Sequence, residues 1–221
     1  MSGAPVVWTV VVAGGTGHRF GGPKQFEPLD GGRIIDWSLR DARRIGDGVV
    51  VVVPAEYLGG DAVVALDCDH CVAGGATRSA SVRAGLGAVP AAADVIVVHD
   101  AARPFAGVAL FREVVAAVTA GADGAVPGVA VTDTIKQVDA GGFVVATPER
   151  SSLVAVQTPQ AFRAEVLRRA HTGAAEGTDD AALVEAIGGR VVVVPGHVDN
   201  RKITVPDDLV WARARARGGA S

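Results

Sequence analysis

The sequence has few cysteines, no strong net charge and no long hydrophobic segment. Its two cysteines, Cys68 and Cys71, are too few for a disulfide framework, which favours a reducing compartment. No apolar run approaches the roughly 18 residues of a membrane span, and the first residues lack the charged region of a signal peptide. With a net charge of -3 and no basic tract, the chain is not expected to bind nucleic acid. We therefore expect a soluble cytoplasmic protein with no membrane partner.

Alanine, valine and glycine dominate instead, with 39, 39 and 29 of the 221 residues. Val-rich runs alternate with Ala/Leu/Arg-rich segments, which predicts one domain over residues 1–221 with a mostly parallel, doubly wound α/β sheet. Strands buried on both faces are predicted at 6–13, 49–53, 95–99, 125–131 and 191–194. Helices are predicted at 34–44, 79–86, 108–120, 161–170 and 179–187, and a last one starts near Thr204, which we pair with Asp207 as an N-terminal box.

One stretch breaks this alternation. Residues 133–139 and 143–147 are prone to form strands and flank Ala140-Gly141-Gly142, which is a turn signal. The pattern predicts a β-hairpin inserted after a core strand, as a protruding β-arm over residues 133–150. A hairpin alone is marginally stable, so we expect the arm to pack on a second subunit.

A glycine-rich loop, AGGTGHRFGGPKQF, follows the first predicted strand over residues 13–26. Glycines let backbone N–H groups approach an anion closely, because no Cβ intervenes. The loop lacks the third glycine of a dinucleotide fingerprint, and Pro23 interrupts its match to a P-loop. We interpret it as a phosphate loop that carries two cations, Arg19 and Lys24. The alternative is a tight turn with surface charges.

Asp100 ends the strand predicted at 95–99, within the segment HDAARP. A carboxylate at the carboxyl end of such a strand lies where open α/β sheets bind ligands. It suits Mg²⁺, which takes one or two carboxylates together with substrate phosphates. The alternative is a helix-capping aspartate that pairs with Arg103.

Two further segments are ambiguous on their own. In GGATRSASV, residues 74–82, small residues leave room for a flat base whose edge Ser81 or the main chain reads. A plain turn capped by Thr77 or Ser79 fits equally well. The run from Cys68 to Cys71 provides at most half of a zinc site, and we interpret it as strand residues.

Read together, six segments have an order and spacing that closely resembles the 2-C-methyl-D-erythritol 4-phosphate cytidylyltransferase family. They are 13–26, 74–82, 99–104, 133–136, 158–160 and 200–209. The resemblance implies a Rossmann-like nucleotidyltransferase fold, Mg²⁺ dependence and a homodimer whose β-arms cross between subunits. It implies that CTP and 2-C-methyl-D-erythritol 4-phosphate, a small sugar-alcohol phosphate, give 4-diphosphocytidyl-2-C-methyl-D-erythritol and pyrophosphate.

The resemblance also implies roles for particular residues. Arg19 and Lys24 match residues that stabilise the transition state, and Arg150 and Lys202 match those that position the substrate phosphate. The nucleotide-binding set is Ala13, Gly14, Gly15, Gly17, Gly75, Ser81, Asp100 and Arg103, with Asp100 also near the metal. The substrate-lining residues are Thr134, Thr158 and Thr178. Gly14, Ala76 and Arg201 depart from the family pattern, which usually has Ala, an acidic residue and an apolar residue there.

Three other functions compete with this one. A ribitol-5-phosphate cytidylyltransferase would share much of the first loop, but 133–136 and 150–153 look more like the methylerythritol enzyme. An NAD-dependent oxidoreductase is disfavoured by Phe20 and Lys24. A non-catalytic nucleotide-binding module is disfavoured because Arg19, Lys24 and Asp100 occur together.

Overall fold

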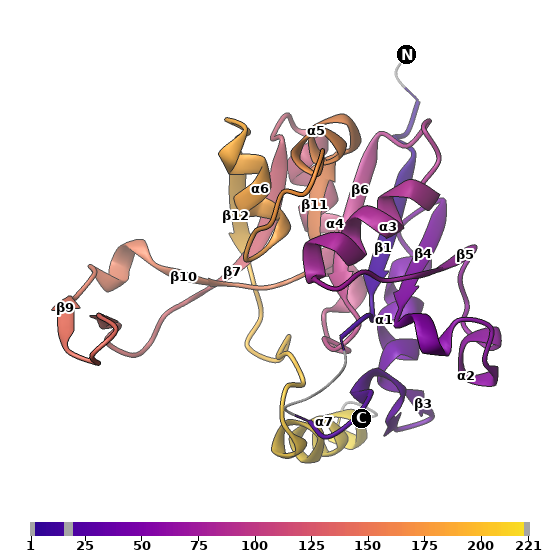
Figure 1. Ribbon diagram of the computed structural model, residues 1–221, viewed down its shortest axis with the longest axis horizontal. Helices are drawn as coiled ribbons and strands as arrows, with labels where there is room; N and C mark the ends of the chain where they lie inside the picture. Colours follow the sequence, from indigo (N-terminus) through magenta and orange to yellow (C-terminus); the bar gives the residue numbers. More distant parts are fainter. Residues whose placement is uncertain (1–2, 16–19, 219–221) are drawn as a thin grey trace.

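An eight-stranded sheet with helices on both faces forms the centre of the protein, which we describe from a computed structural model over residues 3–15 and 20–218 (Figure 1). The strands of this sheet are β1 (Val7–Val12), β4 (Gly48–Val53), β5 (His70–Ala73), β6 (Val95–Asp100), β7 (Gly124–Ala130), β10 (Val154–Val156), β11 (Gln160–Arg163) and β12 (Val191–Pro195). Its helices are α1 (Ile34–Arg43), α2 (Asp61–Val64), α3 (Arg78–Ala88), α4 (Gly107–Thr119), α5 (Ala164–Ala170), α6 (Asp180–Ala186) and α7 (Pro206–Gly218).

The sheet is mostly parallel, as the alternation predicted. The strand order is β10-β7-β11-β6-β1-β4-β5, and β12 pairs with β7. β1 lies between β4 and β6 and is parallel to both, and β5 and β12 are also parallel to their neighbours. Because β1, β4, β5 and β6 point the same way, their carboxyl ends meet at one edge of the sheet. No helix of the described residues is long and apolar enough to cross a membrane.

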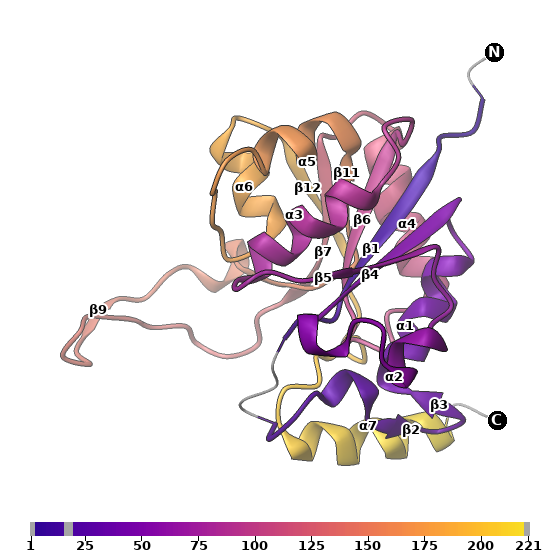
Figure 2. The same cartoon turned by 45° about the vertical axis from the view of Figure 1, so that its right-hand side comes forward.

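Alternate valines of the central strands fill two separate cores. In β4, Val49, Val51 and Val53 belong to a core shared with α1 and α4, whereas Val50 and Val52 belong to a core shared with α3, α5 and α6. Figure 2 shows α1 and α4 on one face of the sheet and α3, α5 and α6 on the other. Every residue of β4 is buried. A valine that is fully buried stabilises the fold by roughly 1.5–3 kcal/mol, so these runs contribute much of the stability of the sheet.

The predicted helix 161–170 is wrong at its start. Residues 160–163 form β11, which runs antiparallel between β6 and β7, and α5 begins only at Ala164. Ala161 and Phe162 are completely buried in the sheet. The gap between β6 and β7 needs a strand to pair their backbone groups, and this tertiary demand overrides the helix-like local sequence.

Two other local predictions are corrected, and one is refined. Strand β12 is not buried on both faces, since Val192 and Val193 are 42% and 48% exposed at the border of the sheet. At the start of α7, the Asp208 carboxylate, rather than that of Asp207, accepts the N–H groups of Thr204 and Val205. Cys71 lies in β5, as predicted, whereas Cys68 lies just before that strand.

The predicted hairpin is present and projects away from the sheet (Figures 1 and 2). Its strands, β8 (Gln137–Val138) and β9 (Val144–Ala146), pair antiparallel and have no core of their own. The hairpin thus exposes apolar side chains, of which Phe143 is 75% exposed.

A second two-stranded ribbon, β2 (Pro28–Leu29) with β3 (Gly32–Arg33), packs against α7.

Two glycines of α3 test how tightly this helix packs on the sheet. A Cβ atom at Gly85 would lie 2.5 Å from a Val10 methyl carbon, whereas a Cβ at Gly87 would meet nothing within 4 Å. We expect Gly85→Ala to lower the free energy of unfolding by about 1–3 kcal/mol through overpacking. The control Gly87→Ala raises it by up to about 1 kcal/mol through helix propensity. Urea denaturation of both variants measures the difference, and equal effects would contradict the packing argument.

Candidate active site

A polar pocket of about 160 Å³ lies beyond the carboxyl end of β6. It carries three cationic side chains and two carboxylates, so its balance of charge favours an anionic ligand. The lining residues are Arg78, Asp100, Arg103, Val156, Gln157, Thr158, Gln160, Thr178, Asp179 and Lys202. Five residues that the sequence nominated, Asp100, Arg103, Thr158, Thr178 and Lys202, therefore meet here although they are far apart in the chain.

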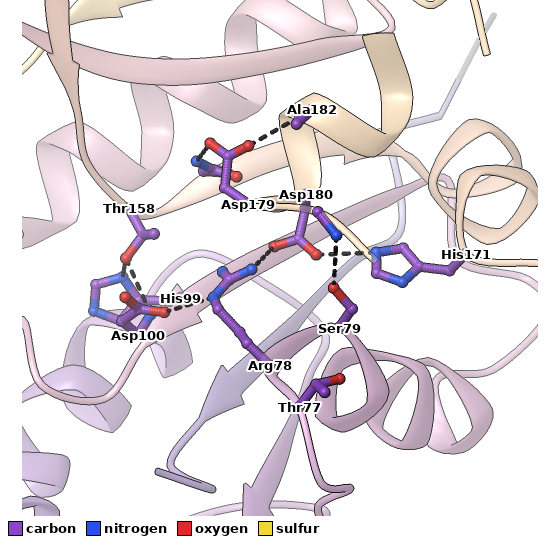
Figure 3. A network of polar contacts seen from close by, with 12 residues as sticks. Thr77, Arg78, Ser79, His99, Asp100, Thr158, His171, Asp179, Asp180 and Ala182 are labelled. Carbon is purple, nitrogen blue, oxygen red and sulfur yellow. Dashed lines mark hydrogen bonds and ion pairs between the residues drawn. The ribbon is translucent and has the colours of Figure 1, made fainter. Parts of the chain in front are cut away.

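Asp100 is the centre of this pocket's charge. Its carboxylate lies 2.6 Å from Lys202 Nζ through Oδ2. Its Oδ1 lies 3.3 Å from Arg78 Nε (Figure 3). Burial by itself would raise the pKa of Asp100, but the charges of Lys202 and Arg78 outweigh burial and hold it well below its usual range. Asp100 is therefore an anion throughout the physiological pH range. The alternative of a capping aspartate paired through its side chain with Arg103 is wrong, because Lys202 and Arg78 take the carboxylate.

His99 and Thr158 form a buried support behind Asp100. The Thr158 hydroxyl accepts the backbone N–H of Asp100 at 3.0 Å and lies 3.1 Å from His99 Nδ1. His99 Nε2 lies 3.2 Å from the Arg103 carbonyl oxygen, which can only accept, so we assign the ring proton to Nε2. Burial lowers the pKa of His99 to about 4, although the nearby Asp100 opposes that shift. This neutral imidazole connects Thr158 to the loop that carries Arg103.

Lys202 reaches the pocket from a loop that is anchored on both sides. Asn200 is fully buried, and its amide donates to Gln157 Oε1 and to the carbonyl of Thr158. Ile203 is fully buried in the small core under α7, and its N–H donates to the Ala102 carbonyl. These anchors hold the backbone of Lys202 beside the strand end that carries Asp100.

The two glycine-rich segments lie against each other. Ala13 is buried, and Gly14 lies so close to Ser81 that a Cβ at residue 14 would be 3.1 Å from Ser81 Oγ. The Ser81 hydroxyl accepts the N–H of Gly75 at 3.2 Å and donates to the Thr77 carbonyl at 2.9 Å. Thr77 caps α3, as one of the sequence interpretations held. Ser81 thus shapes the loop at Gly75, while Gly15 is exposed beside it.

The cations of the first loop are only partly described. Gly17 and Arg19 lie outside the described residues, so their predicted roles stay predictions. Lys24 begins the short 3₁₀ turn Lys24–Phe26 and acts electrostatically on Asp208 at the start of α7. Gln25, in the same turn, is buried and donates to the Ala13 carbonyl at 2.8 Å. That bond ties the far end of the glycine-rich loop to the carboxyl end of β1.

The arm residues are not brought to the pocket of their own chain. Thr134 is exposed in the arm, and Arg150 lies in a 3₁₀ turn at its base, donating to the Thr132 carbonyl at 2.7 Å. Neither of them lines the pocket. The arm that carries them projects outward from the sheet (Figure 1).

Sequence reasoning missed Arg78. This residue, in the first turn of α3, bridges Asp100 and Asp180, with Nη1 2.7 Å from Asp180 Oδ2 (Figure 3). Asp180 is completely buried, and its second oxygen lies 2.9 Å from His171 Nε2. An arginine just after a glycine-rich turn at a strand end was the available signal. Its two partners could not be read from the sequence because they lie 22 and 102 residues away.

The fold and pocket define a Rossmann-like α/β protein with a polar, cation-rich pocket at the carboxyl edge of its sheet. The chain belongs to the 2-C-methyl-D-erythritol 4-phosphate cytidylyltransferase family, whose profile matches residues 7–217. The enzyme of that name from Rhodococcus jostii (strain RHA1) is 46% identical, over 98% of this chain and 97% of its own length.

Solved structures of this family share the fold. The crystal structure of the cytidylyltransferase from Thermus thermophilus matches with a TM-score of 0.79 and 34% identity, over 94% of this chain and 98% of that one. The 4-diphosphocytidyl-2C-methyl-D-erythritol synthase from Anaerococcus prevotii gives a TM-score of 0.83 at 26% identity, over 96% of this chain and 99% of that one. These findings give no support to the oxidoreductase, ribitol-phosphate or non-catalytic alternatives.

Some relatives are longer than this chain. The bifunctional enzyme IspD/IspF of Nitratidesulfovibrio vulgaris (strain DP4) is 43% identical over 94% of this chain, but the match covers only 57% of that enzyme. The chain therefore spans little more than half the length of the bifunctional relatives it matches.

The buried His99 predicts a pH dependence of stability. Because burial lowers its pKa to about 4 while the unfolded chain binds that proton near pH 6.5, the unfolded state holds more protons between these values. His99 thus makes the free energy of unfolding fall by about 1.4 kcal/mol per pH unit as pH drops through this window. We expect His99→Gln to remove that part of the slope in denaturation series from pH 7 to 4. An NMR titration of the His99 ring with a midpoint above pH 6 would contradict the assignment.

Proposed function

We propose that this chain transfers the cytidylyl group of CTP to 2-C-methyl-D-erythritol 4-phosphate. An oxygen of the substrate phosphate attacks the α-phosphorus of CTP, the new P–O bond forms, and the bond to the β-phosphate breaks, so that pyrophosphate leaves. The observation that carries the proposal is the pocket at the end of β6, where Asp100, Arg103 and Lys202 meet in a member of this family.

The reaction does not require a general base. A phosphate monoester has a second pKa near ~6 and is largely ionised at neutral pH. His99 is unsuited to the role, because it is fully buried and both of its ring nitrogens lie against protein partners. The task of the site is to bring two anions together and to stabilise the charge that develops at phosphorus.

The cations of the site suit this task. In the proposal, Lys24 and Arg19 of the glycine-rich loop stabilise the transition state. Lysine offers a compact charge for this role, and arginine offers a planar fork of donors. Lys202 takes the phosphate of the sugar alcohol, which its position at the pocket's border allows, since its side chain is 39% exposed. Gly14, Gly15 and Gly75 form the wall against which the cytidine lies, with Ala13 and Ser81 supporting them.

The donors present fit a magnesium ion that is bound mainly by the substrate. Asp100 offers one carboxylate that stays ionised. This is the donor set expected when one carboxylate and the substrate phosphates share the ion. A bound Mg²⁺ would neutralise charge on the triphosphate.

The arm points to a homodimer with shared sites. Thr134 and Arg150 lie outside the pocket of their own chain, and the hairpin has exposed apolar residues, among them Val138, Phe143 and Val144. In the proposed dimer, each arm covers the exposed apolar residues of the partner's hairpin. It also delivers its own Thr134 and Arg150 to the partner's pocket.

We also place the protein in the cytoplasm, since Cys68 and Cys71 are both free thiols.

The proposed reaction predicts pyrophosphate release from CTP only when 2-C-methyl-D-erythritol 4-phosphate is added. We expect turnover to exceed that with ATP, GTP or UTP, to stop with a chelator and to return with Mg²⁺. A coupled pyrophosphate assay on the full-length chain measures these rates. Faster turnover with ribitol 5-phosphate would show that ribitol 5-phosphate is the acceptor instead. Nucleotide binding without turnover would overturn the proposal.

The shared-site proposal predicts complementation. We expect Lys24→Ala and Arg150→Ala each to lower kcat by roughly 10²–10³-fold, because each removes a preorganised cation. After subunit exchange, a mixed dimer keeps one intact site, so an equal mixture recovers about a quarter of the wild-type activity. The control mixture of Lys24→Ala and Lys202→Ala stays inactive, because both residues belong to the same chain's pocket. No recovery after verified exchange would place Arg150 in its own chain's site.

A further inference from the structure

Two cations share Asp100, and they differ in how firmly they are held. Lys202 reaches Asp100 Oδ2 from the border of the pocket with a side chain that is 39% exposed. Arg78 is 25% exposed and engages two carboxylates at once, Asp100 through Nε and Asp180 through Nη1. A planar guanidinium suits this bridge, because its donors are fixed in a fork, whereas an ammonium has no such fork.

The far end of Arg78 is anchored in the interior. The Asp180 side chain is 1% exposed, and its other oxygen is 2.9 Å from Nε2 of His171, which is itself buried. Figure 3 shows the chain of contacts from His171 through Asp180 and Arg78 to Asp100. A buried carboxylate is costly unless it is paired and hydrogen-bonded, so Asp180 gives Arg78 a fixed attachment that Lys202 lacks.

Further hydrogen bonds join the start of α3 to the segment before α6, on either side of the Arg78–Asp180 contact. The N–H of Gly177 donates to Ser79 Oγ at 3.3 Å, and the Thr77 hydroxyl donates to Glu176 at 2.9 Å. These contacts hold the start of α3 against the segment that leads into α6. Arg78 is therefore held by two carboxylates, Asp100 and Asp180, whereas Lys202 pairs with Asp100 alone among the described residues.

We propose that Arg78, anchored by the buried Asp180–His171 pair, is a positioning residue that keeps Asp100 oriented and charge-compensated when Lys202 leaves it for the substrate phosphate. This inference rests on the proposed function for the role of Lys202. In this arrangement Arg78 is the permanent partner of Asp100, and Lys202 is the exchangeable one. Without Arg78, Lys202 would be the main partner of the carboxylate and would be released less readily.

The test compares Arg78→Gln with Arg78→Lys and with the control Arg83→Gln. Arg83 lies on the same helix but contacts Glu176 and the Ala175 carbonyl instead of Asp100. We expect Arg78→Gln to raise the KM for 2-C-methyl-D-erythritol 4-phosphate by about 10- to 100-fold, with a smaller fall in kcat. Arg78→Lys restores the charge without the fork and recovers only part of the loss, and Arg83→Gln behaves as the wild type.

A second readout does not depend on turnover. The Lys202 ammonium held by Asp100 is less available to an acylating reagent, so we expect Arg78→Gln to slow acetylation of Lys202 by N-hydroxysuccinimidyl acetate severalfold. Peptide mass spectrometry measures this rate, with Lys136 of the arm as internal reference. Thermal unfolding of each variant shows whether it remains folded. If the protein has no cytidylyltransferase activity, the labelling still decides the role of Arg78.

The anchor is tested by a double-mutant cycle. If Asp180 acts through Arg78, the effects of Arg78→Gln and Asp180→Asn on kcat/KM are non-additive, and the double variant is little worse than the poorer single one. Three results would overturn the proposal: unchanged Lys202 labelling in Arg78→Gln, wild-type kinetic constants in Arg78→Lys, or full additivity in the cycle.

Discussion

The pairing of one buried carboxylate with two cations is the interaction on which the site depends. Asp100 ends the central strand β6, so the sheet itself fixes its position. Lys202 and Arg78 come from segments 102 and 22 residues away and meet at its two oxygens. Burial of this anion without them would be unfavourable. The requirement to compensate its charge therefore draws the α3 loop and the segment before α7 to the same edge of the sheet.

The body and the arm of the molecule have different physical origins. In the body, alternate valines of β1 and β4 fill two cores, and the pocket is built on this rigid support. The arm has a two-stranded hairpin whose apolar side chains are exposed, so its own contacts contribute little stability. A site divided between these parts is complete only when two chains meet, which links catalysis to assembly in the proposed function.

Much of the fold was readable from local sequence, and the errors have identifiable causes. The valine runs predicted β1, β4 and β6 within a residue or two, because strands buried on both faces are continuously apolar. β11 was mistaken for the start of a helix, since its role is to fill the gap between β6 and β7. The exposure of Val192 and Val193 was missed for a similar reason, because only the strand order shows that β12 lies at a border.

The sequence by itself determined the class of sheet, the glycine-rich loops and the set of polar residues from which the site is drawn. Periodicity and residue type are local properties, so they can be recognised directly in the sequence. Only the tertiary structure decided which of these residues meet. It placed Asp100, Thr158 and Lys202 in one pocket, left Thr134 and Arg150 on an outward arm, and added Arg78 through its bridge to Asp180. Such contacts depend on strand order and long-range charge compensation, which no local pattern encodes.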